Sequence, residues 1–345
     1  MGSLRKLYVQ CNPLLDICAH VDRDFLQKYK IAENTSMLMS DEHVGLYDEL
    51  EGKQNVFYVP GGSGLNTARV AQWISQAPRN SFVTYVGCIA EDRHGSILKE
   101  AAEKEGLNMI LDYTTKAPTG ICAACIVGME RSLVANLGAA NHLSPEHIES
   151  DAVSKALEDS KLFYLTGFTL TIDVNYVLKV AKASREVNGI FMLNLSAPFI
   201  VQCFTDQLKK VLPYVDILFS NEDEARSLAK VNGWDTEDVA EIAQRAAVEL
   251  PYDGHYDRLV VFTQGNQPTV FATMSSRTGS VPVPPIETHK IVDTNAAGDS
   301  FVGGFLAAFA SGIDIERCCE VGNYAAGIVI QHHGCTYPEK PDITF

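Results

Sequence analysis

"YVDILFSNEDEARSL" occupies residues 214–228 and carries the pattern from which the fold can be inferred. Its first half, 214–221, is a short apolar segment typical of a buried strand, and a helix is expected from 222 to 231. Three more apolar segments of this kind are "KLFYLTGF" (161–168), "GIFMLNLS" (189–196) and "DRLVVFTQG" (257–265). Helices are expected between them, including segments near 173–187 and 235–249. Such alternation predicts an α/β fold whose mostly parallel central sheet is covered by helices on both faces.

Polar side chains follow several of these strands. In an open parallel sheet, ligands bind outside the carboxyl ends of the strands. The residues expected at this edge are Asn221, the segment from Thr263 to Gly265 and the segment from Asn194 to Phe199.

Two earlier regions have a different pattern, with short strand candidates and many polar positions. Residues 117–139 predict a β-hairpin that turns near Gly128, Met129 and Glu130. Together with residues 13–61, this hairpin is expected to form a small β-rich lid. The large α/β domain would then consist of residues 1–12, 62–116 and 140–345, so the lid is discontinuous along the chain.

The composition limits the partners. The chain has 345 residues, of which 46% are hydrophobic, and its formal net charge is −15. Nucleic acid and anionic membranes are therefore not expected to bind it. No apolar run is long enough for a membrane span, and nine cysteines without a secretory segment indicate reduced thiols in the cytoplasm. The "CAAC" pair, Cys122 and Cys125, lies in an apolar strand candidate and is interpreted as two buried thiols.

The segment "IVDTNAAGDSFVGGFLAAF" (291–309) places a small-residue turn before an apolar helix. The backbone N–H groups of Ala297, Gly298 and Asp299 would form an anion site at the helix start. Asp299 is a candidate general base for a hydroxyl that attacks phosphorus. The alternative is that Asp293 and Asp299 only cap the helix. Two glycines inside the helix, 303 and 304, indicate a close approach of backbone or ligand.

A second small-residue cluster stands in "VPGGSGLNTARVAQW" (59–73). Gly61 and Gly62 would let the backbone approach a small ligand, and Asn66 would face the same pocket; the alternative is a flexible turn with a helix cap. Asp16, after the first strand, is a candidate for holding two vicinal sugar hydroxyls, or else a solvated loop residue.

Two further candidates carry charge. Asn221 and Glu224 lie one helical turn apart, which is the pattern of a capping box and also that of a pair orienting hydrated Mg²⁺. Arg131 lies at the tip of the predicted hairpin, where arginine is ordinarily solvated. In a closing lid it could reach a transferring phosphoryl group.

Taken together, these motifs resemble the ribokinase (PfkB-type) carbohydrate kinase family. Residues 293–299 match its D-T-x-G-A-G-D signature, "GGSGLN" its N-terminal glycine motif, and residues 221–224 its N-x-x-E motif. Longer strings resemble the members that act on adenosine: "NPLLDI", "VAQW", "PTGICAACI", "RSLVANLGAAN", "LNLSAPFI", "PYVDILFSNEDEA", "VFTQG" and "GCTYPEKPD".

The resemblance implies ATP-dependent phosphorylation of the 5′-hydroxyl of adenosine to AMP, a purine-salvage reaction with Mg²⁺. It implies that Asp299 is the base, that 297–299 form the anion hole and that Arg131 neutralises the phosphoryl group. Asp16, Gly62 and Asn66 would hold the ribose. The remaining substrate candidates are Asn12, Leu14, Gly61, Ser63, Cys122, Leu133, Ala135, Leu137, Phe168 and Asn295. The ATP candidates are Asn194, Asn221, Thr263, Gly265, Ala296 and Asn323.

Ala296 stands where the family signature has glycine, so this residue must avoid positive φ. Two alternatives stay open at this point. One is a kinase of the same fold that acts on another nucleoside or a sugar, and the other is a nucleoside-binding protein without activity. A monomer is expected.

Overall fold

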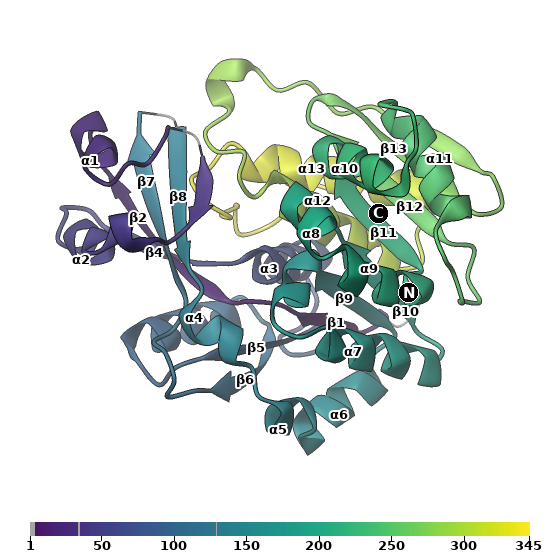
Figure 1. Ribbon diagram of the computed structural model, residues 1–345, viewed down its shortest axis with the longest axis horizontal. Helices are drawn as coiled ribbons and strands as arrows, with labels where there is room; N and C mark the ends of the chain where they lie inside the picture. Colours follow the sequence, from purple (N-terminus) through teal and green to yellow (C-terminus); the bar gives the residue numbers. More distant parts are fainter. Residues whose placement is uncertain (1–3, 34, 129) are drawn as a thin grey trace.

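The computed structural model describes residues 4–33, 35–128 and 130–345. A nine-stranded sheet with the order β14-β13-β12-β11-β10-β9-β1-β5-β6 forms its centre (Figure 1). Strands from β12 to β6 pair in parallel, whereas β13 and β14 are antiparallel. The strands are β1 (Leu7–Gln10), β5 (Val83–Ile89), β6 (Asn108–Tyr113), β9 (Leu162–Thr166), β10 (Ile190–Asn194), β11 (Ile217–Asn221), β12 (Leu259–Gln264), β13 (Gln267–Thr273) and β14 (Thr278–Val281).

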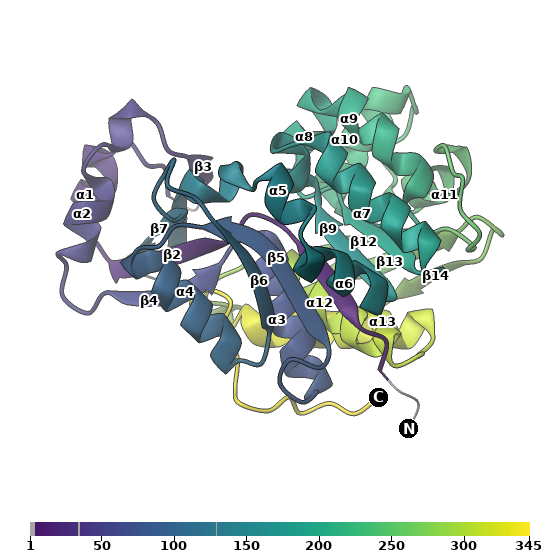
Figure 2. The ribbon, with the colours of Figure 1, turned by 90° about the horizontal axis from the view of Figure 1, so that it is seen from below.

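Helices cover both faces of this sheet (Figure 2). Successive residues of β9 show why both faces are apolar: Leu162 and Tyr164 enter one core, and Phe163 and Leu165 enter the other. The first core is closed by α3 (Ser63–Ser75), α4 (Arg93–Lys104), α12 (Ala297–Ala310) and α13 (Ile315–Val329). The second is closed by α5 (Pro145–Ile148), α6 (Asp151–Asp159), α7 (Val174–Glu186), α8 (Pro198–Cys203), α9 (Thr205–Val211), α10 (Glu222–Asn232) and α11 (Val239–Glu249).

A second sheet of five strands, ordered β3-β8-β7-β2-β4, lies beside the first (Figure 1). Its strands are β2 (Leu14–His20), β3 (Ser36–Leu38), β4 (Phe57–Gly61), β7 (Ile121–Val127) and β8 (Glu130–Asn136). The short helices α1 (Arg23–Lys28) and α2 (Leu46–Glu51) pack on one face. Single 3-10 turns occur at Asp41–His43, Gly138–His142, Gly167–Thr171, Leu212–Tyr214 and Thr288–Lys290.

Strand periodicity separates the two faces of this small sheet. Ile17, Ala123 and Val134 pack beneath α1 and α2. The alternate positions, which include Asp16 and Arg131, therefore point to the opposite face. The small sheet thus turns a partly polar face away from its own helices.

The predicted elements of the main sheet are confirmed, with shorter strands than the apolar runs. The helix expected from 235 begins at Val239, because Asp238 accepts a bond from Glu241 N and caps it. The expected hairpin is formed by β7 and β8, where Val127 pairs with Glu130. Met129, predicted at its turn, lies outside the described residues.

The two glycines inside α12 make room for neighbouring helices. A Cβ at Gly303 would lie 2.7 Å from the Thr67 carbonyl oxygen in α3, and one at Gly304 would lie 2.7 Å from the Val321 carbonyl oxygen in α13. Of the two explanations for these glycines, close approach of backbone or of ligand, the structure supports the first, because the close partners are helices of the chain itself. None of the helices in the described part of the chain is long and apolar enough to cross a bilayer.

Candidate active site

Asp299 lies in the first turn of α12 and bonds to the first turn of α3. Ser63 Oγ donates to Asp299 Oδ1 at 2.6 Å, and Asn66 Nδ2 donates to Oδ2 at 3.0 Å. Burial raises the pKa of Asp299 to about 6, although both bonds oppose the rise, and Asp16 adds to it. The carboxylate therefore does not cap its own helix. It is held in place and remains mostly ionised at neutral pH.

The start of α12 has no side-chain cap. Ala297 N donates to the Thr294 carbonyl at 3.1 Å, so this N–H group closes the preceding turn. The expectation that it is free to bind an anion is therefore wrong. Gly298 N and Asp299 N have no acceptor among the described residues, and a Cβ at Gly298 would meet nothing within 4 Å. Ala296 has φ −99°, so its methyl group is accommodated without left-handed strain. The start of α12 is therefore open, with a geometry that suits an anion.

Asp16 and the glycine pair are packed against each other. A Cβ at Gly61 would lie 2.3 Å from Asp16 Oδ1. Gly62 has φ +90°, and a Cβ there would lie 2.3 Å from the Asn12 carbonyl oxygen. A side chain at Gly61 would collide with the Asp16 carboxylate, and one at Gly62 would collide with the backbone of Asn12. The glycine pair is therefore a close-packed element and not a flexible turn.

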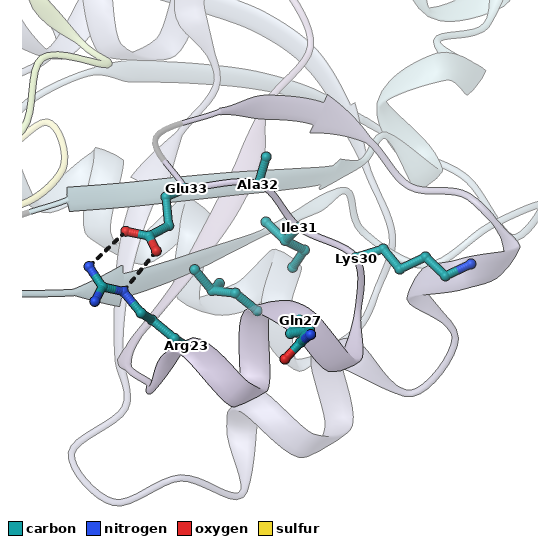
Figure 3. Close-up of a pocket in the computed structure, with 7 residues that line it drawn as sticks. Arg23, Gln27, Lys30, Ile31, Ala32 and Glu33 are labelled. Atoms are coloured by element: carbon teal, nitrogen blue, oxygen red, sulfur yellow. Dashed lines mark hydrogen bonds and ion pairs between the residues drawn. The ribbon is translucent and has the colours of Figure 1, made fainter.

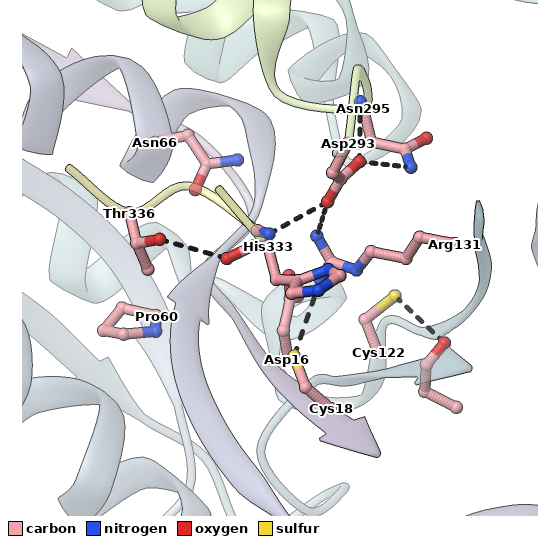
Figure 4. A network of polar contacts seen from close by, with 12 residues as sticks. Asp16, Cys18, Pro60, Asn66, Cys122, Arg131, Asp293, Asn295, His333 and Thr336 are labelled. Atoms are coloured by element: carbon pink, nitrogen blue, oxygen red, sulfur yellow. Dashed lines mark hydrogen bonds and ion pairs between the residues drawn. The ribbon is translucent and has the colours of Figure 1, made fainter. Parts of the chain in front are cut away.

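Arg131 is not at the solvated tip of the hairpin; it is 3% exposed. Its Nη2 donates to Asp16 Oδ2 at 2.7 Å and its Nη1 to Asp293 Oδ2 at 2.7 Å, as Figure 4 shows. Two carboxylates from distant segments replace the water that would otherwise solvate this guanidinium.

Asp293 is the centre of this network. Its Oδ2 also accepts from Gly334 N at 2.9 Å, and its Oδ1 accepts from the backbone and side-chain nitrogens of Asn295 at 2.9 and 2.8 Å. Burial opposes ionisation, but Arg131 and these N–H groups outweigh it and lower the pKa of Asp293. Asn295 Oδ1 in turn accepts from Ser36 Oγ in β3 at 3.4 Å.

An apolar cluster lies on the same small sheet. Five of the purine-pocket candidates gather in it, together with buried Ala140: Leu14, Cys122, Leu133, Ala135 and Leu137. Phe168 was expected with them, but it packs against the second core and its ring centroid lies 6.2 Å from that of Phe199. Asn12, buried beside this region, donates from Nδ2 to Asn141 Oδ1 at 3.2 Å.

Asn221 and Glu224 form a capping box at the start of α10. Glu224 N donates to Asn221 Oδ1, and Asn221 donates to the Glu224 carboxylate from its backbone and its side chain at 3.1 and 2.9 Å. Burial raises the pKa of Glu224 to about 7, and Asp299 contributes to the rise. The pair thus keeps a carboxyl group of raised pKa within electrostatic reach of Asp299.

The other strand-end candidates lie where parallel pairing puts them. Asn194 and Thr263 stand at the carboxyl ends of β10 and β12, on either side of Asn221 in β11. Gly265 follows with φ +57°. Asn323 lies apart, in α13, and its Oδ1 accepts from Thr269 Oγ1 at 2.9 Å.

The cysteine interpretation agrees with the structure: Cys122 and Cys125 are buried and free. Burial raises the pKa of Cys125 to about 12, which favours the protonated thiol. Among the described residues, no group of three or more His, Cys, Asp and Glu side chains is arranged to hold a metal ion.

The surface hollow in Figure 3 lies along α1, lined by Arg23, Gln27 and Glu33, on the side of the small sheet away from Asp299.

Sequence reasoning missed three partners in this region. Asn141, Ser36 and Gly334 each bond to a candidate residue through a contact between distant segments. Asn141 and Gly334 stand in strings that resemble the family, but nothing in their local pattern indicates a partner.

Comparison with known proteins now identifies the class. A model of the pfkB family carbohydrate kinases matches residues 26–342, and the chain belongs to this family. Its relatives within the family include adenosine kinases. Adenosine kinase 2 of Arabidopsis thaliana is 44% identical over 331 residues, covering 96% of this chain and 95% of that protein.

Solved structures agree. The apo adenosine kinase of Trypanosoma brucei brucei superposes with a TM-score of 0.94 at 55% identity, covering 96% of this chain and 100% of that one. The adenosine kinase of Schistosoma mansoni in complex with adenosine and AMP gives a TM-score of 0.86 at 32% identity, covering 96% and 97%.

Proposed function

We propose that this kinase transfers the γ-phosphoryl group of ATP to the 5′-hydroxyl of adenosine, giving AMP and ADP. The observation that carries the proposal is the position of Asp299. It stands at a helix start without a side-chain cap, where the N–H groups of Gly298 and Asp299 have no acceptor among the described residues, and Ser63 and Asn66 orient both of its oxygens. The substrate is inferred from relatives that match nearly the full chain and are named adenosine kinase.

In the proposed reaction, Asp299 accepts the proton of the 5′-hydroxyl as its oxygen attacks the γ-phosphorus. The bond from that phosphorus to the β–γ bridging oxygen breaks, and ADP leaves with the bond's electron pair. The N–H groups of Gly298 and Asp299 stabilise the developing charge. We assign the ribose to Asp16, Gly62 and Asn66.

The apolar cluster around Leu14 and Cys122 is the proposed purine site, because transfer from water into an apolar cluster costs less for a purine ring than for a free sugar with its many hydroxyls.

ATP would lie along the strand ends at Asn194, Thr263 and Gly265. We further propose that residues 13–61 and 117–139 act as a lid that excludes water.

A divalent cation fits beside Glu224. This buried carboxylate has a raised pKa, so a cation would favour its charged form, and each of its oxygens keeps a lone pair after capping. Asn221 and Glu224 would hold Mg²⁺ through water. The bound ion would supply charge neutralisation on the phosphates.

The test is ADP formation from ATP and Mg²⁺ with adenosine, inosine, guanosine, ribose or no acceptor. Turnover with adenosine and AMP as product is expected. Turnover only with another acceptor would keep the Asp299 mechanism but reject the purine site. Adenosine binding without turnover would instead favour a binding protein.

A further inference from the structure

Arg131 is bonded to two carboxylates, and the proposed function gives one of them another task. Its Nη2 and Nη1 each lie 2.7 Å from a carboxylate oxygen, of Asp16 and of Asp293 respectively. A Cβ added at Gly334 would lie 3.3 Å from Nη1, so this loop closes over the guanidinium. Asp16 is also the residue assigned to the ribose hydroxyls, and a vicinal diol that bonds to both of its oxygens would compete with Arg131 Nη2 for Oδ2.

The guanidinium is enclosed but incompletely bonded. Arg131 Nε is buried and has no hydrogen-bond partner in the described part of the chain. No bond or ion pair joins Arg131 to Asp299 among those residues. An unpaired donor on a buried cation is costly, so this arrangement leaves one site for a further acceptor.

We propose that Asp16 and Asp293 hold Arg131 in a resting ion triad, and that the 2′,3′-diol of the bound ribose releases it by taking over Asp16. The inference rests on the proposed function. It makes the diol a requirement for turnover as well as for binding, and so makes the Asp16–Arg131 pair a determinant of specificity for ribonucleosides.

The geometry of arginine explains what release would provide. Nε and Nη2 lie on the same side of the guanidinium and form a fork that matches two oxygens of one phosphoryl group. Asp16 and, more weakly, Cys18 Sγ at 3.7 Å now accept from Nη2, and the Nε arm is empty in the described part of the chain. When Asp16 turns to the diol, only the weak contact with Cys18 Sγ remains on the fork, while Asp293 still holds Nη1 beside the start of α12.

The experiment measures kcat at saturating adenosine and at saturating 2′,3′-dideoxyadenosine in the wild type and in Asp16→Asn. In the wild type, kcat with the dideoxy acceptor is expected to be at most about one tenth of kcat with adenosine, because a charge-assisted bond still blocks the fork. In Asp16→Asn, kcat with adenosine falls, but kcat with dideoxyadenosine rises above the wild-type value. A residue that only binds the diol would give no such rise.

Asp22→Asn is the matched control. Asp22 lies on the same small domain and caps α1 through Phe25 N, a task that Asn performs equally well. The ratio of the two kcat values should not change in this variant. If Asp16→Asn does not fold, Arg131→Lys gives the same information, because a lysine head has no fork; kcat with adenosine should then fall to the level of the dideoxy acceptor.

Equal wild-type kcat values for the two acceptors would overturn the inference while leaving the proposed function intact. A dideoxy kcat that falls in Asp16→Asn would overturn it as well. A wild type that binds adenosine but produces no AMP would reject the proposed function, and this inference with it.

Discussion

Asp299 is the residue on which the proposed chemistry depends. Ser63 and Asn66 fix its two oxygens, yet burial still raises the pKa of the carboxyl to about 6. A base whose pKa lies slightly below the working pH is ionised and still accepts a proton readily. Ionised Asp299 therefore lowers the free energy of unfolding at neutral pH, because its pKa is higher in the folded protein than in the unfolded chain.

Asp299→Asn tests the role of this residue. We expect turnover to fall by about 10²- to 10⁴-fold, the range typical of a lost general base. Adenosine binding should stay close to that of the wild type, because the amide keeps the shape of the side chain. Calorimetric titration and initial rates measure the two quantities separately. Turnover near the wild-type level would reject Asp299 as the base.

The pKa of Asp299 also predicts the pH dependence of the reaction. Its folded value is raised from 3.8 to about 6, so protonation removes the base as the pH falls through about 6. The rate constant kcat/KM should therefore be constant above this region and decline tenfold per pH unit below it. An acid limb near pH 4 would show that the free enzyme's base has an ordinary carboxyl pKa.

At the scale of elements, the site depends on how closely α12 lies against α3. These two helices carry Asp299 on one side and Ser63 and Asn66 on the other. Gly303 sits at their contact, where an added Cβ would lie 2.7 Å from the Thr67 carbonyl oxygen and from Val70 Cβ. A backbone carbonyl cannot move aside as a side-chain end can, so the helix pair itself must separate.

Gly303→Ala is expected to lower the free energy of unfolding by about 1–3 kcal/mol through overpacking. Turnover should also fall, because separation of the helices lengthens the bonds to Asp299. Denaturant unfolding and initial rates are the measurements. Gly327→Ala in α13 is the control, since its Cβ would meet only the end of Ile286 at 3.3 Å and should be neutral or stabilising. Equal effects of the two changes would refute the packing argument.

At the scale of the whole molecule, Arg69 joins segments that are distant in sequence. It is 3% exposed in α3, and its Nη1 donates to the Pro60 carbonyl oxygen at 2.6 Å, directly before the glycine pair. Its Nε and Nη2 donate to the Glu105 carboxylate at 2.8 and 2.7 Å. Tyr337 Oη also donates to Glu105, at 2.6 Å, so the C-terminal segment is tied to the same point.

Arg69→Met is expected to destabilise the protein by about 3–5 kcal/mol, because Glu105 and the Pro60 carbonyl lose a buried partner. Thermal and denaturant unfolding measure the loss. Arg277→Met is the control, since the side chains of Arg277 and Glu316 are 50% and 46% exposed, and exposed pairs contribute about 0–1 kcal/mol. A loss at Arg69 no larger than at Arg277 would show that the network is not structural.

Local patterns accounted for most of the fold. The apolar strands, the amphipathic helices and the β7–β8 hairpin follow from periodicity, which acts over a few residues. Asp299 and the glycine pair were also found from local motifs and family resemblance. The start of α11 was misplaced because Asp238, rather than an earlier residue, caps it.

The contacts that complete the site have no local signal. Arg131 was expected at the tip of the hairpin, either solvated or reaching a phosphoryl group, yet it is buried against Asp16 and Asp293, which lie 115 and 162 positions away in the chain. Whether a charged side chain is solvated or paired depends on which segments the two sheets bring together. The sequence alone therefore determines the elements, the order of the strand-helix units and the candidate residues. The long-range packing of the two sheets decides their partners, because a buried charge takes its energy from whichever counter-charge the fold places beside it.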